Sequence, residues 1–144
     1  MALLSDQDRK TVASHLADIV HPVKILFFTQ TIGAPETVHI TKQILDELVA
    51  LNELVSFDEV NVILDRDRAA AYGVTSAPAL VLLRGEEDTG IRFLGAPAGY
   101  EFMSLVEAVI LAGTDDSGLT PASKELIASH VSAPLDILVF ATPT

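Results

Sequence analysis

The chain has 144 residues, 49% hydrophobic and 20% charged, a composition typical of one globular domain and not of a disordered tail. It contains no cysteine, which excludes disulfides, thiolate metal sites and thiol chemistry for the sequence as written. With 20 acidic residues against 9 lysines and arginines, the formal charge of -11 would repel phosphate backbones. No apolar run approaches the roughly 20 residues of a membrane span. We therefore expect a cytoplasmic protein that binds neither nucleic acid nor membranes.

The first part of the chain alternates helix and strand signals. Apolar residues at helical spacing predict a helix over 6–20. The sequence VKILFF, ending near Thr29, is β-rich and almost unbroken in apolar character, as expected of a strand buried on both faces of a parallel sheet. Residues 30–35 have turn chemistry, and an amphipathic stripe then predicts a helix that ends near residue 51.

The middle of the chain continues this alternation. A strand is predicted over 55–63, followed by a short helix that Gly73 ends. PALVLL at 78–83 and IRFL at 91–94 predict an antiparallel hairpin around a charged turn, RGEEDTG, and a last amphipathic helix runs to about 113. The resulting order of elements is β-α-β-α-β-β-α. We therefore predict an α/β fold in which helices flank a mixed sheet.

The tail of the sequence repeats its head. After a linker over 114–119, Thr120 and Pro121 predict the start of another helix. ASHVSAPLDILVFATPT, at 128–144, matches ASHLADIVHPVKILFFTQT, at 13–31, and at a constant offset Pro134, Ile137, Leu138 and Phe140 correspond to Pro22, Ile25, Leu26 and Phe28. We predict a complete domain over 1–113, whereas 114–144 hold a linker with the first helix and strand of a second, incomplete unit.

This order of elements, with a turn after the first strand and Ser76-Ala77-Pro78 opening the third, resembles the thioredoxin fold. The strings FFTQTIGAPET, AAAYGVTSAPALVLL and GIRFLGAPAGYEF, with the half-repeat ending VFATPT, are similar to the glutaredoxin-like protein disulfide oxidoreductases. Those proteins carry two thioredoxin units in tandem and are similar to the N-terminal domain of the alkyl hydroperoxide reductase flavoprotein subunit. The resemblance covers essentially the whole chain and implies a cis Ala77–Pro78 bond that faces the active-site turn.

A dithiol catalyst of this kind places C-x-x-C where a helix N-terminus lowers the pKa of a thiolate. By resemblance, the two cysteines correspond to Ala34 and Thr37, neither of which forms a thiolate. Disulfide exchange requires thiolate attack on sulfur, so we predict that these are degenerate dithiol positions and that the chain is redox-inert, with no catalytic residue. We expect the neighbouring turn and strand start to bind peptide through Gly33, Pro35, Ser76, Ala77 and Pro78.

The sequence indicates no metal or cofactor. Four histidines are scattered over separate predicted elements: His15, His21, His39 and His130. Glu36-x-x-His39 is only half of a carboxylate metal motif. We therefore expect surface histidines, no metal site and no cofactor.

Three functional hypotheses are left open by the sequence. The first is a structural or peptide-binding unit with protein or peptide clients. The second is an enzyme: the chain is a fragment or cysteine-less variant of a thiol-disulfide oxidoreductase of cell redox homeostasis whose dithiol lies beyond Thr144. The third is a glutathione-binding, transferase-like protein, for which only Thr31 and Thr37 offer hydroxyls near the turn. In addition, an unpaired apolar strand promotes association, so we expect a homodimer through the strand at 134–141.

Overall fold

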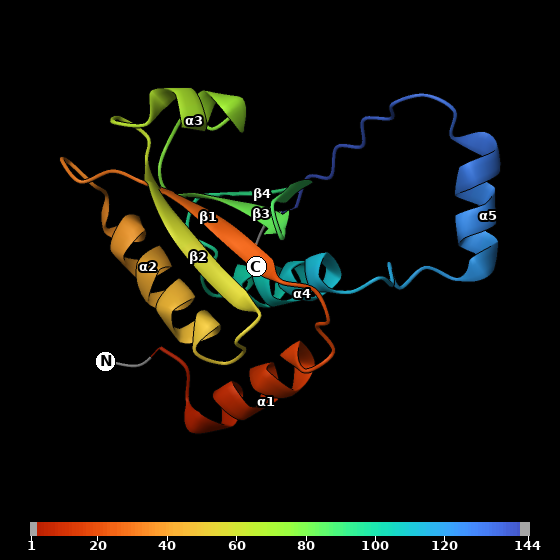
Figure 1. The fold of residues 1–144 in the computed structure, drawn as a ribbon, viewed down its shortest axis with the longest axis horizontal. Helices are drawn as coiled ribbons and strands as arrows, with labels where there is room; N and C mark the ends of the chain where they lie inside the picture. Colours follow the sequence, from red (N-terminus) through yellow and green to blue (C-terminus); the bar gives the residue numbers. More distant parts are fainter. Residues whose placement is uncertain (1–2, 142–144) are drawn as a thin grey trace.

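The computed structural model describes residues 3–141 (Figure 1). From residue 23 to residue 113 the elements follow the predicted order. The bounds in the structure are α1 (Asp6–Leu16), β1 (Val23–Thr29), α2 (Glu36–Val49), β2 (Val55–Asn61), α3 (Arg66–Ala71), β3 (Ala79–Arg84), β4 (Glu87–Leu94), α4 (Glu101–Gly113) and α5 (Pro121–His130).

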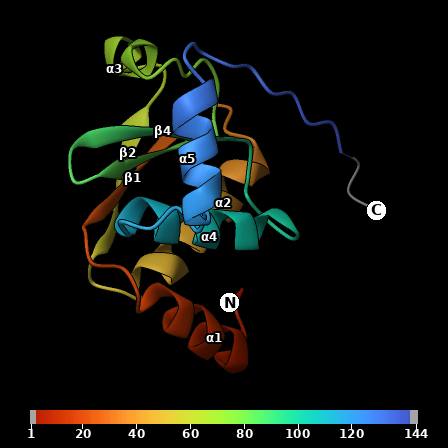
Figure 2. The same cartoon turned by 90° about the vertical axis from the view of Figure 1, so that its right-hand side faces the viewer.

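The four strands form one mixed sheet in the order β2-β1-β3-β4. β1 runs parallel to β2 and antiparallel to β3, and β3 runs antiparallel to β4. Helices α1, α2 and α4 contribute to the apolar core on one face of the sheet, whereas α3 contributes to the smaller core on the other face (Figures 1 and 2). The predicted α/β class, with helices flanking a mixed sheet, is therefore confirmed.

Strand β1 is the centre of the sheet and is buried on both faces. Ile25 and Phe27 belong to the core under α1, α2 and α4, whereas Leu26 and Phe28 belong to the core under α3. All four side chains have an exposed fraction of 0%. Because successive residues of a strand point to opposite faces, the nearly unbroken apolar run of β1 supplies both cores. This is the arrangement that the sequence predicts.

The first helix is shorter than predicted, since α1 ends at Leu16 and not near residue 20. The backbone N–H groups of Val20 and His21 donate to the carbonyl oxygen of Gly113 at 2.9 and 3.0 Å. These donors therefore fix the connection to the end of α4 instead of continuing the helix. Ile19 still packs in the core, so it is apolar like the buried residues of α1 and continues their helical spacing although it lies beyond the end of the helix.

The hairpin is tighter than predicted. Arg84 pairs with Glu87, so only Gly85 and Glu86 form the turn, and β4 begins at Glu87 instead of residue 91. Charged residues are compatible with the exposed edge of a sheet, where they hinder pairing with other chains. The charges at 87 and 88 thus belong to an edge strand and not to a loop.

The C-terminal segment forms its predicted helix but not its predicted strand. The Thr120 hydroxyl oxygen caps α5 by accepting a hydrogen bond from the N–H of Ser123 at 3.2 Å. Residues 134–141 form no strand in this structure, and residues 142–144 lie outside the described part of the chain. A strand requires a hydrogen-bonded neighbour. Figure 1 shows α5 standing away from the sheet, and Figure 2 shows the chain after α5 running away from the sheet as well.

Candidate functional site

Three connecting segments meet at one end of the sheet. The register pairs Thr29, the last residue of β1, with Asn61 at the end of β2, and pairs Phe28 with Ala79 at the start of β3. The N–H of Val62 also donates to the carbonyl of Thr29 at 2.9 Å. The turn over 30–35, the segment after Asn61 and the segment before Ala79 therefore lie at the same end of the sheet, where parallel strands present their carboxyl ends.

The turn before α2 is held by local contacts. Gly33 adopts a φ of 67°, a left-handed conformation that favours glycine, and the Gln30 side-chain amide donates to its carbonyl at 3.0 Å. Pro35 is the N-cap residue of α2, and its carbonyl accepts from the N–H of Val38 at 3.0 Å. Ala34 therefore stands just before the helix, and Thr37 is the second residue of its first turn.

The start of α2 offers no sulfur nucleophile. Ala34 is half-buried against the core and presents only a methyl group, whereas Thr37 and Glu36 are exposed. The buried hydroxyl of Thr41 donates to the carbonyl of Thr37 at 2.7 Å, which satisfies that hydroxyl one turn further along the helix. Hydrogen bonds thus hold the helix start in place, but its side chains provide a methyl group, a hydroxyl and a carboxylate where a dithiol catalyst needs two thiols.

The segment before β3 approaches the same core. Ser76 is exposed, Ala77 is half-buried and Pro78 is buried, and the Ala77–Pro78 peptide bond is cis. Ala77 packs against the same core as Ala34. The carbonyl of Pro78 accepts from the N–H of Gly95 at 2.9 Å, which joins the loop after β4 to this end of the sheet.

Three exposed apolar side chains surround this end of the sheet, and sequence reasoning missed them. Ile32 is 93% exposed, Leu64 is 81% exposed and Ile63 is 54% exposed. Together with Thr31 and Asn61 they line a cavity of about 100 Å³. Single apolar residues within turns have no periodicity, so the only signal for Ile32 and Leu64 was their position just after two predicted strands. Ile63 was predicted as the last residue of the strand over 55–63, but β2 ends at Asn61.

Asn61 organises the loop that carries two of these side chains. Its side-chain oxygen accepts from the N–H groups of Ile63 and Leu64 at 2.9 and 3.1 Å. Its side-chain amide donates to the hydroxyl of Thr31 at 3.2 Å, which connects this loop to the turn before α2. One amide thus positions the apolar residues of both loops.

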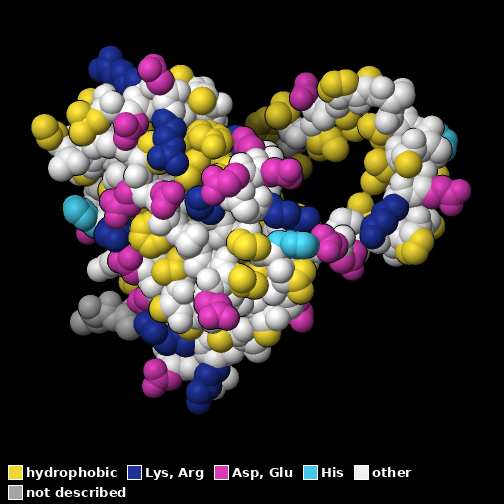
Figure 3. Space-filling model, in the orientation of Figure 1, with side chains coloured by type: hydrophobic (Ala, Val, Ile, Leu, Met, Phe, Trp, Pro, Cys, Tyr) yellow, Lys and Arg dark blue, Asp and Glu magenta, His cyan; other side chains and the backbone are white. Residues whose placement is uncertain are grey.

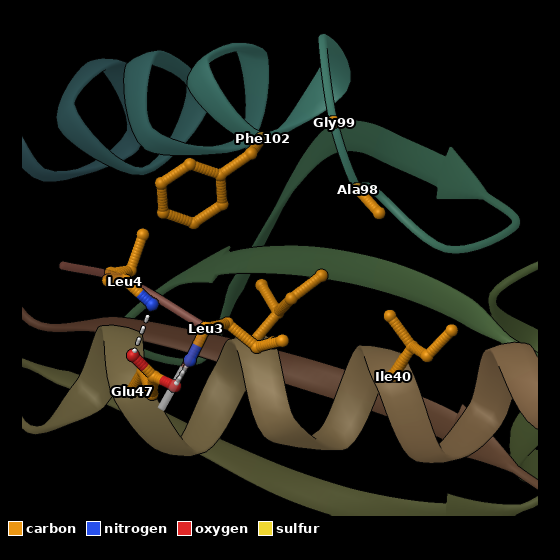
Figure 4. Close-up of a pocket in the computed structure, with 8 residues that line it drawn as sticks. Leu3, Leu4, Ile40, Glu47, Ala98, Gly99 and Phe102 are labelled. Carbon is orange, nitrogen blue, oxygen red and sulfur yellow. Dashed lines mark hydrogen bonds between the residues drawn. The ribbon is translucent and has the colours of Figure 1, made fainter. Parts of the chain in front are cut away.

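A second cavity, of about 300 Å³, lies on the flank of α2 between the N-terminal segment and the start of α4 (Figure 4). Its walls are mainly apolar and come from Leu3, Leu4, Ile40, Ile44, Ala98, Gly99 and Phe102, with Glu47 at its end.

The Glu47 carboxylate ties the N-terminal segment to α2 beside this second cavity. It accepts hydrogen bonds from the N–H groups of Leu3 and Leu4. It also forms an ion pair with the Arg9 guanidinium, at 2.9 Å. Burial alone would raise the pKa of Glu47, but these bonds outweigh burial and lower it. Because the carboxylate is engaged in this way, we assign it a structural role.

Within residues 3–141, no group of three or more histidine, aspartate and glutamate side chains is placed to share a metal ion. His21 instead contacts the Asp115 carboxylate at 3.0 Å, and the His130 ring lies 3.1 Å from the carbonyl of Leu126 in α5. None of the helices in this part of the chain has the length and apolar character needed to cross a bilayer.

The mixed sheet, its flanking helices and the turn before α2 define a protein of the thioredoxin fold. Among solved structures, the chain is similar to the alkyl hydroperoxide reductase AhpF from Enterococcus faecalis, with a TM-score of 0.78 and 25% identity over 86% of this chain and 59% of that one. It is also similar to a protein disulfide oxidoreductase from Aeropyrum pernix, with a TM-score of 0.72 and 28% identity over 87% of this chain and 54% of that one. The resemblance seen in the sequence is thereby confirmed.

More distant likenesses extend only to the fold. A thioredoxin from Halobacterium salinarum matches with a TM-score of 0.55 and 18% identity. No model of a known protein family matches the sequence, and no curated protein matches it either. The chain spans between half and two thirds of the length of the reductase and the disulfide oxidoreductase described above.

Proposed function

We propose that residues 1–113 form a thioredoxin-like unit that is redox-inert and that binds an extended, apolar segment of a client protein. The binding surface is the end of the sheet where the turn before α2, the loop after β2 and the start of β3 meet. The single observation that carries this proposal is the exposure of Ile32, Ile63 and Leu64, which line one cavity between the loop after β2 and the turn before α2.

The absence of redox chemistry follows from the side chains at the helix start. Disulfide exchange begins with attack by a thiolate on a sulfur atom. Ala34 has no ionisable group, the Thr37 hydroxyl is not a sulfur nucleophile, and the sequence contains no cysteine that could replace either. The two structural neighbours described above are named as a reductase and an oxidoreductase, so this unit shares their scaffold without a dithiol of its own.

The apolar side chains give the surface its affinity for a client. Burying a Leu or Ile side chain that is otherwise exposed contributes roughly 1.5–3 kcal/mol. In this proposal, Ile32 and Leu64 contact the apolar side chains of the client. Ser76 and the backbone of Ala77 form hydrogen bonds with the main chain of the client. Gly33 and Pro35 shape the turn before α2, which forms the wall of the binding surface opposite Ser76 and Ala77.

Fluorescence anisotropy with a dye-labelled, extended peptide rich in Val and Thr tests this surface. We expect Ile32→Ser and Leu64→Ser each to weaken binding about tenfold, the equivalent of ~1.4 kcal/mol. The matched control is Val20→Ser, because Val20 is 63% exposed and precedes β1, at the opposite end of the sheet. Equal weakening by the control, or no binding by the unmodified chain, would contradict the proposal.

We further propose that residues 114–144 are a linker followed by the start of a second thioredoxin-like unit. The internal repeat supports this organisation, as does the greater length of the structural neighbours. These observations also favour a second candidate function, in which the chain is part of a thiol-disulfide oxidoreductase whose dithiol lies beyond Thr144. Translation of the reading frame past Thr144 decides this point. A C-x-x-C motif in the turn after the first strand of the second unit supports the enzyme, and the absence of that motif there contradicts it.

A further inference from the structure

An open hollow of about 550 Å³ continues the proposed binding surface toward α3, and we call it the α3 hollow. Ile63 lines both this hollow and the smaller one beside Ile32, so the two adjoin on one surface. Val74 and Thr75, which precede β3, also line it. Because Ser76 follows Thr75 directly, the α3 hollow leads to the strand start that we propose binds the main chain of the client.

One side of α3 forms much of the α3 hollow. It contributes Arg66, Ala69, Ala70 and Gly73, which have the spacing of residues on one face of a helix. Ala69 and Val74 are apolar and buried, whereas Ala70 and Gly73 are small and exposed. An extended chain can therefore lie close against this side of α3.

Arg66 supplies the charge of this surface. Within residues 3–141, no other lysine, arginine, aspartate or glutamate lines either of the two hollows. Arg66 is exposed and forms no ion pair in that part of the chain. Three other arginines each pair with a carboxylate: Arg9, Arg84 and Arg92. In a chain with a net charge of -11, this guanidinium thus stays available for a carboxylate from another molecule.

The acidic neighbours of Arg66 in the sequence do not occupy its guanidinium. Asp65 and Asp67 line a different hollow, together with Arg68, and neither aspartate lines the α3 hollow. The two aspartates are balanced by the two arginines of the same segment, DRDR, so this segment carries no net negative charge. Figure 3 shows hydrophobic side chains beside Lys or Arg side chains over the loop after β2 and the start of α3, at the upper left.

We propose that the client segment carries an acidic residue, Asp or Glu, next to its apolar residues, and that the Arg66 guanidinium binds this carboxylate. The inference rests on the proposed binding function and adds the charge of the client to it. Arginine suits this role because its planar fork of N–H donors matches both oxygens of a carboxylate. Ile32, Ile63 and Leu64 give affinity for any apolar segment, whereas Arg66 selects those with an acidic flank.

Two peptides with the same core, rich in Val and Thr, test this selection by fluorescence anisotropy. One is flanked on both sides by Glu and the other by Gln. We expect the unmodified chain to bind the Glu-flanked peptide about fivefold more tightly, the effect of a partly exposed, charge-assisted hydrogen bond. The net charge of -11 alone would favour the Gln-flanked peptide, so long-range attraction cannot produce this order.

Arg66→Gln should remove the preference, so that the Glu-flanked peptide binds no more tightly than the Gln-flanked one. The matched control is Lys10→Gln, which changes the net charge by the same amount. Lys10 is also exposed and forms no ion pair within residues 3–141, but it lies on α1, on the other face of the sheet. Lys10→Gln should therefore keep the preference.

The outcomes separate this inference from the binding function on which it rests. Equal binding of the two peptides by the unmodified chain, a preference that survives Arg66→Gln, or one that Lys10→Gln also removes would overturn the role of Arg66 and leave peptide binding intact. Binding of neither peptide by the unmodified chain would contradict the proposed function, and the role of Arg66 with it.

Discussion

Ala34 and Thr37 determine what the start of α2 can do chemically. Backbone N–H groups at a helix N-terminus stabilise negative charge whatever side chain is present. In this chain the residues at those positions carry no thiol on which that stabilisation could act. The effect of the helix N-terminus on the pKa of a thiol can therefore be measured by introducing cysteines at these positions.

Ala34→Cys combined with Thr37→Cys should introduce insulin-disulfide reductase activity, which the unmodified chain should lack. We expect the thiol at position 34 to titrate below the ordinary cysteine pKa of about 8.5, because the helix N-terminus favours the thiolate. The control is Ala128→Cys with Val131→Cys, which has the same spacing at the C-terminal end of α5, where the helix dipole disfavours a thiolate. A thiol at position 34 that titrates like the control thiols would show that the turn is not a dormant dithiol site.

Asp88 should make the hairpin sensitive to acid. Hydrogen bonds from the Arg92 guanidinium and from the N–H of Gly90 lower the pKa of Asp88 to about 2. Because the folded pKa lies below the ordinary value of about 3.9, this carboxylate contributes stability that is complete above that value and is lost as the pH falls toward about 2.

Thermal unfolding of Asp88→Asn checks the pH dependence of this contribution. The variant should have a lower Tm than the unmodified chain at neutral pH, and the difference should shrink as the pH falls from about 4 to about 2. Glu87→Gln is the control, since Glu87 is an exposed neighbour on β4 and forms no ion pair among residues 3–141. A difference in Tm that stays constant with pH would contradict this role of Asp88.

At the scale of the elements, the contact between α4 and the connection from α1 to β1 depends on Gly113. A Cβ atom at this position would lie 2.6 Å from Cγ2 of Ile19 and 3.1 Å from Cγ2 of Val23. Gly113→Ala should therefore lower the free energy of unfolding by about 1–3 kcal/mol, because a well-packed core accommodates an extra methyl group only with strain. Urea unfolding measures the effect, and Ser104→Ala, an exposed change on α4, should stay within about 0.5 kcal/mol of the unmodified chain. An unchanged Gly113→Ala would show that this junction repacks freely.

The elements differ in how well the sequence predicts them. β1 is predictable because its burial on both faces imposes an apolar run on the sequence. The start of β4 is not, because an edge strand tolerates the charges of Glu87 and Asp88, which resemble a turn. The end of α1 is also not predictable, because Ile19 is buried by tertiary contacts and continues the helical spacing of apolar residues after the helix has ended.

At the scale of the whole molecule, the sequence predicts where the candidate site lies better than it predicts what surrounds it. The order of a strand, a turn and a helix predicts that Ala34 and Thr37 lie at the start of a helix, and the resemblance to the disulfide oxidoreductases implies that they occupy the dithiol positions. The convergence of Ile32 and Leu64 does not, because it depends on the register between β1 and β2, which a single sequence does not reveal. Residues 134–141 show the opposite case: their apolar pattern predicts a strand, but they form none in this structure, because a strand requires a hydrogen-bonded neighbour.

The central claim is that the end of the sheet around α2 is a binding surface for an extended apolar peptide. Nuclear magnetic resonance of the ¹⁵N-labelled chain, titrated with a peptide rich in Val and Thr, tests it most directly. We predict saturable shifts in the backbone amide signals of residues 30–37, 61–64 and 76–77, and unchanged signals around Val20 at the opposite end of the sheet. Shifts centred elsewhere, or no saturable shift at these residues, would contradict the account.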